Sequence, residues 1–132
     1  MARPEAEHPT ELELEILKIL WSESPLPVRE VRLQLERDAA RPLAHSSVIT
    51  ILNIMYRKGF VTRERDGKSF LFSPRIPRES VAGEMMQDLL SRVFSGSAAQ
   101  MMLNLLETSD LDEEELVAMR KMINRKVKEH RQ

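Results

Sequence analysis

The chain of 132 residues is long enough for one domain, or for a small domain with an appendage. Its 42% hydrophobic and 31% charged residues are typical of a folded, soluble protein. No apolar run approaches the ~18 residues that would span a bilayer. The absence of cysteine excludes disulfides, thiolate metal sites and a cysteine nucleophile. The polar start, Met1–His8, is unlike a signal peptide, so we expect a cytoplasmic protein without membrane insertion.

The formal net charge of −1 hides an uneven distribution along the chain. Residues 1–40 carry a net charge of −4 and residues 76–132 a net charge of −2, whereas residues 41–75 carry +5. Binding to a polyanion depends on local charge, because counterions are released only where phosphates are neutralised. The segment 41–75 is therefore the candidate for contact with nucleic acid.

Three amphipathic helices are predicted before Gly59. Thr10 and Glu13 have the spacing of a capping box, which predicts a helix over residues 11–22. A second helix is predicted over residues 28–38, after the proline-rich interruption at 25–27. A third should be capped by Ser46 or Ser47 and run to about Lys58. Its apolar stripe consists of Val48, Ile51, Leu52 and Met55.

The pattern becomes strand-like after Gly59, which is expected to end the third helix in a left-handed conformation. Residues 60–65 and 68–73 are short runs rich in β-branched, aromatic and charged side chains. Asp66-Gly67 between them is a strong hairpin signal. Phe70 and Phe72 alternate along the second run, so both should face the helices. Three helices followed by a basic hairpin indicate a winged helix-turn-helix; the alternative is a generic α+β domain whose hairpin only packs.

Beyond Pro77 the chain is predicted to be entirely helical, with breaks at residues 95–97 and 108–110. The last helix begins with acidic residues and ends with basic ones, which complements the helix dipole. So short a segment can barely close a core alone, and methionine-rich faces suit a partner surface. We expect these faces to pair two copies of the chain, rather than to form a core that covers the wing. The predicted dimerisation residues are Met85, Leu89, Val93, Met102, Leu106, Leu116, Met119 and Ile123.

The predicted fold is thus mainly α with a small β-hairpin wing. It divides into a winged helix-turn-helix DNA-binding domain over residues 1–76 and a helical dimerisation domain over residues 77–132. In such a fold the third helix enters the major groove of double-stranded DNA, while the wing meets phosphates or the minor groove. Hydroxyls can bond base edges or phosphates, and asparagine can pair bidentately with adenine. The predicted DNA-binding residues are His45, Ser46, Ser47, Thr50, Asn53, Arg57, Arg63, Arg65 and Lys68.

The sequence contains no recognisable pattern for catalysis, a metal or a cofactor. His8, His45 and His130 show no metal-binding spacing, and the four glycines form no phosphate-binding loop. The acidic run at 110–115 lacks the glycine and the spacing of a calcium-binding EF-hand. We therefore expect neither an enzyme nor a bound cofactor or metal.

Several stretches of the chain together resemble the penicillinase repressor family of bacterial regulators, which includes the beta-lactamase and methicillin-resistance repressors. They are Leu14–Trp21, Pro27–Val31, His45–Met55, Lys58–Val61 and Asp66–Pro74. The resemblance covers about residues 10–128 and is specific only as a set. Ser46 and Ser47 stand where the family usually has two threonines, a departure that keeps the hydroxyls.

This resemblance implies a homodimeric repressor that binds an inverted-repeat operator, often one with TACA/TGTA half-sites. Family members are commonly paired with a membrane sensor whose metalloprotease domain triggers derepression. In the best-known members the cut follows an asparagine, and Met102–Leu106 is similar to that motif, with Leu105 in place of the typical phenylalanine. Asn104–Leu105 is then the possible proteolytic site. Alternatively, Asn104 is an ordinary helix residue and another signal controls the protein.

A copper-responsive branch of the family carries a C-terminal cysteine cluster, which this chain lacks, so that mode of metal sensing is not expected. Two other functions stay open on the sequence. One is a winged-helix module for protein–protein contacts without DNA, which the acidic residues 1–40 favour. The other is a repressor of a different winged-helix family that is gated by a small ligand.

Overall fold

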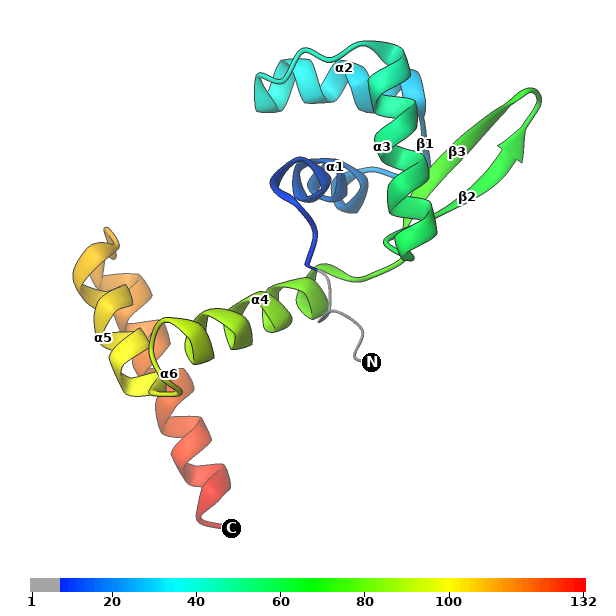
Figure 1. The fold of residues 1–132 in the computed structure, drawn as a ribbon. Helices are drawn as coiled ribbons and strands as arrows, with labels where there is room; N and C mark the ends of the chain where they lie inside the picture. The colour runs from blue at the N-terminus through cyan, green and yellow to red at the C-terminus, as the bar shows by residue number, and fades with distance from the viewer. Residues whose placement is uncertain (1–7) are drawn as a thin grey trace. The chain divides into compact units, whose positions relative to one another are not determined.

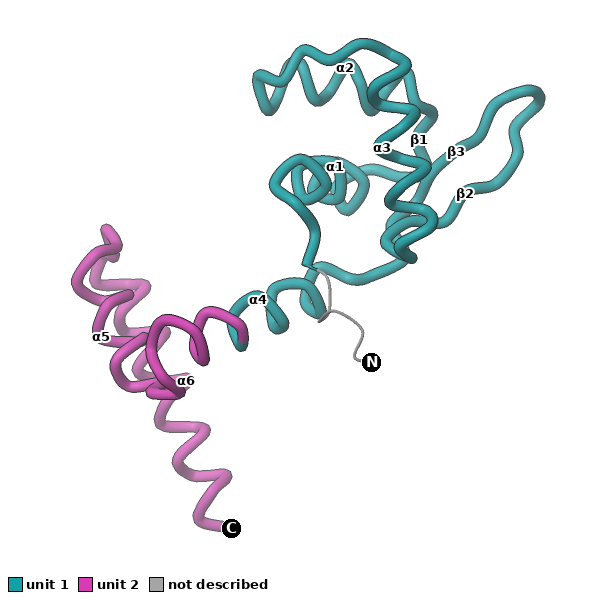
Figure 2. Tube along the Cα trace, in the orientation of Figure 1, with its two compact units in different colours: residues 1–87 teal, residues 88–132 magenta. Residues whose placement is uncertain are grey.

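The computed structural model describes residues 8–132. The remainder of the polar N-terminus, on which the expectation of no signal peptide rests, lies outside the described residues. The chain forms two compact units, residues 1–87 and 88–132, shown in teal and magenta in Figure 2. The division between them falls within helix α4 (Arg78–Arg92). The functional partition at residues 76 and 77 stays a prediction.

The first unit has the predicted mainly α fold with a hairpin wing (Figure 1). In chain order it contains α1 (Glu11–Ser22), β1 (Leu26–Pro27), α2 (Val28–Ala39), α3 (His45–Lys58), β2 (Val61–Asp66), β3 (Ser69–Pro74) and the start of α4. The strands form an antiparallel sheet in the order β1-β3-β2. The strand β1 was not predicted, because residues 25–27 have the pattern of a proline-rich interruption. In the structure Leu26 pairs with Phe72 and Pro27 with Leu71.

The N-terminal caps of α1 and α3 differ from each other. At α1 the predicted capping box is confirmed: the Glu13 amide donates to Thr10 Oγ1 at 3.2 Å, and the Thr10 amide donates to Glu13 Oε1 at 2.9 Å. At α3 the predicted serine cap is wrong. Ala44 holds the N-cap position in an extended conformation and makes no side-chain hydrogen bond. Ser46 and Ser47 lie inside the first turn, where their hydroxyls are exposed and do not cap the helix.

Two glycines end α3 and turn the wing. Gly59 has φ +85°, as predicted for a left-handed helix end, and the Phe60 amide then donates to the Met55 carbonyl at 2.9 Å. The wing turns one residue later than predicted, because Asp66 still pairs with Ser69. Gly67 has φ +64° and Lys68 does not have a positive φ, which suits a two-residue turn that needs glycine at its first central position.

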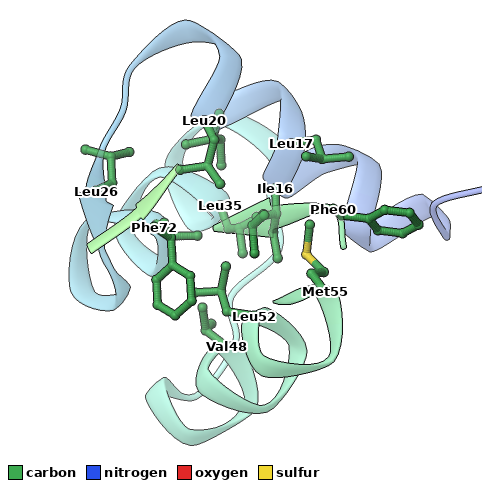
Figure 3. Close-up of a cluster of buried hydrophobic side chains, with 13 residues drawn as sticks. Ile16, Leu17, Leu20, Leu26, Leu35, Val48, Leu52, Met55, Phe60 and Phe72 are labelled. Carbon is green, nitrogen blue, oxygen red and sulfur yellow. The ribbon is translucent and has the colours of Figure 1, made fainter. Parts of the chain in front are cut away.

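The hydrophobic core of the first unit lies between the three helices and the sheet (Figure 3). Val48, Leu52 and Met55 on α3 are fully buried, at the spacing that the apolar stripe predicted. They pack with Phe72 of β3 and with residues of α1 such as Ile16. Each such side chain contributes on the order of 2 kcal/mol of hydrophobic stabilisation. Because this stripe fixes α3 by one face, its opposite face is left at the surface.

The second unit contains the end of α4, then α5 (Ala98–Thr108) and α6 (Glu113–His130). Ser97 caps α5 by accepting from the Gln100 amide at 3.1 Å, and Asp112 caps α6 by accepting from the Glu115 amide at 2.8 Å. Neither α5 nor α6 contains a buried residue. Within residues 8–132, no helix combines the length and apolar character needed to cross a membrane.

Candidate nucleic-acid interface

The face of α3 opposite the core carries a row of small polar side chains. His45, Ser46, Ser47, Thr50 and Arg57 are exposed, whereas Asn53 is half-buried. The Thr50 hydroxyl donates to the Ser46 carbonyl at 3.0 Å, so its proton is already engaged and its oxygen can still accept from an outside donor. This row offers hydrogen-bonding groups that a partner could read without disturbing the core.

Ile49 interrupts this polar row and was not among the predicted site residues. It is 37% exposed, although it is a large β-branched side chain. The sequence could have indicated Ile49 as a site residue, because it lies outside the buried stripe of Val48, Leu52 and Met55. A large apolar side chain on the exposed face of α3 does not contribute to the core. Apolar side chains at such positions can contact the methyl group of thymine.

The wing places three basic side chains near α3, but they are not equivalent. Arg63 is half-buried and donates from Nη1 to Asn53 Oδ1 at 3.0 Å. Arg65 is exposed, and its guanidinium lies 5.2 Å from the centre of the Phe70 ring. Lys68 is exposed in the turn. The structure thus brings Asn53 and Arg63 together, whereas Arg65 and Lys68 extend from the surface.

Two other cations of the basic segment are paired with acidic residues of α1. Lys58 Nζ lies 2.9 Å from Glu13 Oε2, and Arg41 Nη2 lies 3.4 Å from Glu11 Oε1. Among the described residues, no acidic side chain forms an ion pair with Arg57, Arg65 or Lys68. The uncompensated positive charge therefore lies at the last turn of α3 and on the wing.

The α2 helix ends in a local charge pair that is separate from this face. Arg37 Nε donates to Asp38 Oδ1 at 3.0 Å, and this hydrogen bond, together with the charge of Asp38, raises the pKa of Arg37 above its ordinary value. An arginine is already cationic at any physiological pH, so the shift does not alter the charge of the surface.

A hollow of about 440 Å³ lies beside the exposed face of α3. Its walls come from β1 and the start of α2, from α3, and from both strands and the turn of the wing. The lining residues include Arg29, His45, Ile49, Asn53, Arg63, Lys68 and Phe70. Its lining combines basic, apolar and neutral polar side chains. The exposed row of α3 and the wing thus border one continuous, concave surface.

The chain is similar in sequence to several known proteins. The family described as "Penicillinase repressor" matches residues 9–125. The chain is 33% identical over 105 residues to the transcriptional regulator BlaI of Mycobacterium tuberculosis (strain CDC 1551 / Oshkosh), covering 78% of this chain and 75% of that protein. It is 23% identical over 116 residues to the methicillin resistance regulatory protein MecI of Mammaliicoccus sciuri, covering 86% and 91%. It is 26% identical over 107 residues to the penicillinase repressor of Bacillus licheniformis, covering 81% and 82%.

Solved structures with a similar fold include the DNA-binding domain of the repressor BlaI, with a TM-score of 0.46 and 24% identity, covering 59% of this chain and 90% of that one. Another is a MarR family protein from Bacillus stearothermophilus, with a TM-score of 0.48 and 22% identity, covering 93% and 76%. Both TM-scores are below 0.5, so the family is established by sequence alone. The match over residues 9–125 places this chain in the penicillinase repressor family of transcriptional repressors.

Proposed function

We propose that this repressor acts in the cytoplasm by binding an inverted-repeat operator in double-stranded DNA through α3 and the wing. The observation that carries the proposal is the exposed polar face of α3 beside the wing cations Arg65 and Lys68, which form no ion pair with any acidic side chain in residues 8–132. The proposed contacts are His45, Ser46, Ser47, Thr50 and Arg57 on α3, with Arg65 and Lys68 on the wing. Asn53 and Arg63 were also predicted as contacts, but they pair with each other and are treated separately below.

A gel-shift titration on the DNA upstream of the protein's own gene tests this proposal. Binding should be specific and should weaken as salt rises, because phosphate contacts release counterions. Lys68→Ala should weaken binding to all sequences about equally, since a wing cation meets phosphates. Thr50→Ala should instead change the preferred sequence. The proposal fails if no DNA is shifted at low salt.

The chain is proposed to act as a homodimer through the C-terminal half of α4, which begins before the second unit, and through α5 and α6. Large apolar side chains on these helices and in the turn after α4 are exposed in the single chain, including Ile123 at 47% and, in that turn, Val93 at 63%. Apolar residues on the surface of a monomer are normally scattered singly, whereas many are exposed together on these short helices. The proposed dimerisation residues are Met85, Leu89, Val93, Met102, Leu106, Leu116, Met119 and Ile123.

Light scattering on the eluting protein tests the dimer. The full chain should have twice the monomer mass, and Ile123→Glu should shift it towards the monomer, because a carboxylate would be buried without a partner. Asn124→Glu adds the same charge at the neighbouring exposed position and should leave the dimer intact. A monomeric full chain at micromolar concentration would refute this part of the proposal.

Release from the operator is proposed to follow cleavage between Asn104 and Leu105 by a membrane sensor metalloprotease. Both residues are exposed on α5, and the cut would detach α6 with Leu116, Met119 and Ile123. A dimer that loses these contacts would also lose the affinity gained by linking two half-site contacts.

Mass spectrometry of the chain produced together with a candidate sensor tests this mode of release. A fragment that begins at Leu105 is expected. Asn104→Ala should abolish it, whereas Asn124→Ala, which removes an exposed asparagine from α6, should not. If derepression occurs with the chain intact, another signal releases it.

A further inference from the structure

Arg63 joins the wing to α3 through a specific polar contact. Its Nη1 donates to Asn53 Oδ1 at 3.0 Å, across the space between β2 and α3. Because a guanidinium only donates hydrogen bonds, the atom of Asn53 that faces it must be the amide oxygen. Both side chains are half-buried, unlike the exposed His45, Ser46 and Thr50 on the same helix. The contact is therefore partly withdrawn from solvent.

Two aromatic rings enclose the same guanidinium. The central carbon of Arg63 lies 4.0 Å from the centre of the Tyr56 ring and 4.5 Å from the centre of the Phe70 ring. Tyr56 belongs to α3 and Phe70 to β3, so the cation contacts both sides of the groove between helix and wing. Cation–π attraction strengthens when the cation is partly desolvated, as it is here. Arg63 is thus held by three residues from two elements.

This geometry conflicts with the roles that the sequence predicted for Asn53 and Arg63. Bidentate pairing with adenine needs both the amide oxygen and the amide nitrogen of asparagine. In Asn53 the amide oxygen already accepts from Arg63, so an adenine would have to share this oxygen with the guanidinium. To reach a phosphate beyond the groove, the guanidinium of Arg63 would weaken its contacts with both rings and with Asn53.

We propose that Asn53, Tyr56, Arg63 and Phe70 form a clamp that fixes the wing against α3, and that Asn53 and Arg63 are positioning residues rather than DNA contacts. The proposal rests on the proposed DNA binding and specifies its mechanism. The clamp holds Arg65 and Lys68 at a set distance from the exposed face of α3. DNA then binds a wing that is already in place, which lowers the ordering cost of binding for every sequence.

Hydrogen exchange on the DNA-free protein tests the clamp directly. Asn53→Ala should speed exchange of the β2 and β3 amides by about tenfold, because it removes one hydrogen bond to a charged group. Arg63→Ala should speed exchange by at least as much, because it also removes the contacts with both rings. The double variant should show no further increase over Arg63→Ala. Asn53→Asp keeps an oxygen facing Arg63 and should restore protection. Lys68→Ala, which removes the exposed cation of the wing turn, is the matched control and should leave exchange unchanged.

The clamp is refuted in the free protein if Asn53→Ala leaves wing exchange unchanged, or if the two single effects add. Near-ultraviolet fluorescence of Trp21, the single tryptophan of the chain, checks that each variant retains the native core.

Binding to a set of operators, each with one base pair changed, tests the assigned roles. Asn53→Ala and Arg63→Ala should weaken binding to every operator by the same factor, about tenfold, and leave the salt dependence unchanged. Arg65→Ala should lower the slope of log affinity against log salt by about one for each bound copy of the chain. Loss of preference at one base pair in Asn53→Ala, or a lower salt slope in Arg63→Ala, would overturn the proposal. If the wild-type chain binds no DNA, the proposed function fails, while the exchange data still decide the clamp.

Discussion

The ion pair between Lys58 and Glu13 anchors the end of α3 to the start of α1, and its removal gives a quantitative test of the fold. Lys58 Nζ lies 2.9 Å and 3.1 Å from the two carboxylate oxygens of Glu13. The Glu13 side chain is 5% exposed and that of Lys58 28%. Glu13 Oε1 also accepts from the Thr10 amide in the capping box. One buried carboxylate therefore serves both a helix cap and a contact between helices.

The stability lost on removal of Lys58 depends on how far the desolvation of the two charges offsets their attraction. At 2.9 Å and an effective dielectric constant of about 20, the attraction is about 6 kcal/mol. Desolvation of the two charges offsets most of it. Removing only the lysine, in Lys58→Met, leaves the buried carboxylate with one backbone donor. We expect a loss of about 2–3 kcal/mol, somewhat below the ~3–5 kcal/mol of fully buried pairs, because Lys58 is partly exposed.

Glu13→Gln separates the two roles of the carboxylate. Glutamine still accepts from the Thr10 amide, so the capping box persists while the charge is lost. We expect a loss of about 1 kcal/mol, and the double variant with Lys58→Met should be more stable than Lys58→Met alone, because no buried charge is left unpaired.

Urea unfolding followed by Trp21 fluorescence, at fixed protein concentration, measures these differences. Lys18→Met is the matched control: its pair with Glu15 has a separation of 3.8 Å and side chains that are 56% and 31% exposed. It should change stability by less than about 0.5 kcal/mol. If Lys58→Met costs no more than this control, or if the two substitutions at the buried pair are additive, the pair is solvated and does not anchor α3.

Three further changes test local features of the fold and the surface. Gly59→Ala places a side chain at φ +85° and should cost about 1–2 kcal/mol, measured by urea unfolding. Trp21→Phe removes the hydrogen bond from Nε1 to the Ile76 carbonyl at 2.9 Å and should cost about 1 kcal/mol, measured by thermal unfolding followed by circular dichroism. Asp112→Ala removes the cap of α6 and should cost about 1 kcal/mol with a loss of helical signal, whereas an unchanged spectrum and stability would show that the cap is dispensable.

Local signals predicted most of the fold. The capping box of Thr10, the apolar stripe of α3 and the left-handed Gly59 each act within a few residues, so they are visible in a short stretch of sequence. The strand β1 was missed because two residues have no periodicity. Leu26 is a strand residue only because Phe72, far along the chain, offers backbone hydrogen-bonding groups. The serine cap of α3 was predicted two or three residues too late, because the start of that helix is set by Ala44 and its carbonyl.

The candidate site was predictable to the extent that it follows from the helix period. Once Val48, Leu52 and Met55 are assigned to the core, Ser46 and Thr50 must lie on the surface. The helix period does not predict that Asn53 and Arg63 form a hydrogen bond with each other. Both types of residue commonly contact DNA, and their mutual hydrogen bond depends on how the wing folds back against α3. Tertiary contacts decide whether such a side chain is available to a partner.

The same contacts change the meaning of the charge distribution. The sequence places a net charge of −4 on residues 1–40 and +5 on residues 41–75, and the acidic segment favoured a protein-binding module. In the structure, Glu11 and Glu13 pair with Arg41 and Lys58 across these segments. Part of the acidic charge therefore holds α1 against the end of α3 and the segment before it, and is no evidence for a protein partner. The cations left without acidic partners include Arg57 and the wing residues, which lie where α3 and the wing would face a polyanion. Internal pairing thus separates basic residues that position α3 from the basic residues that are proposed to contact DNA.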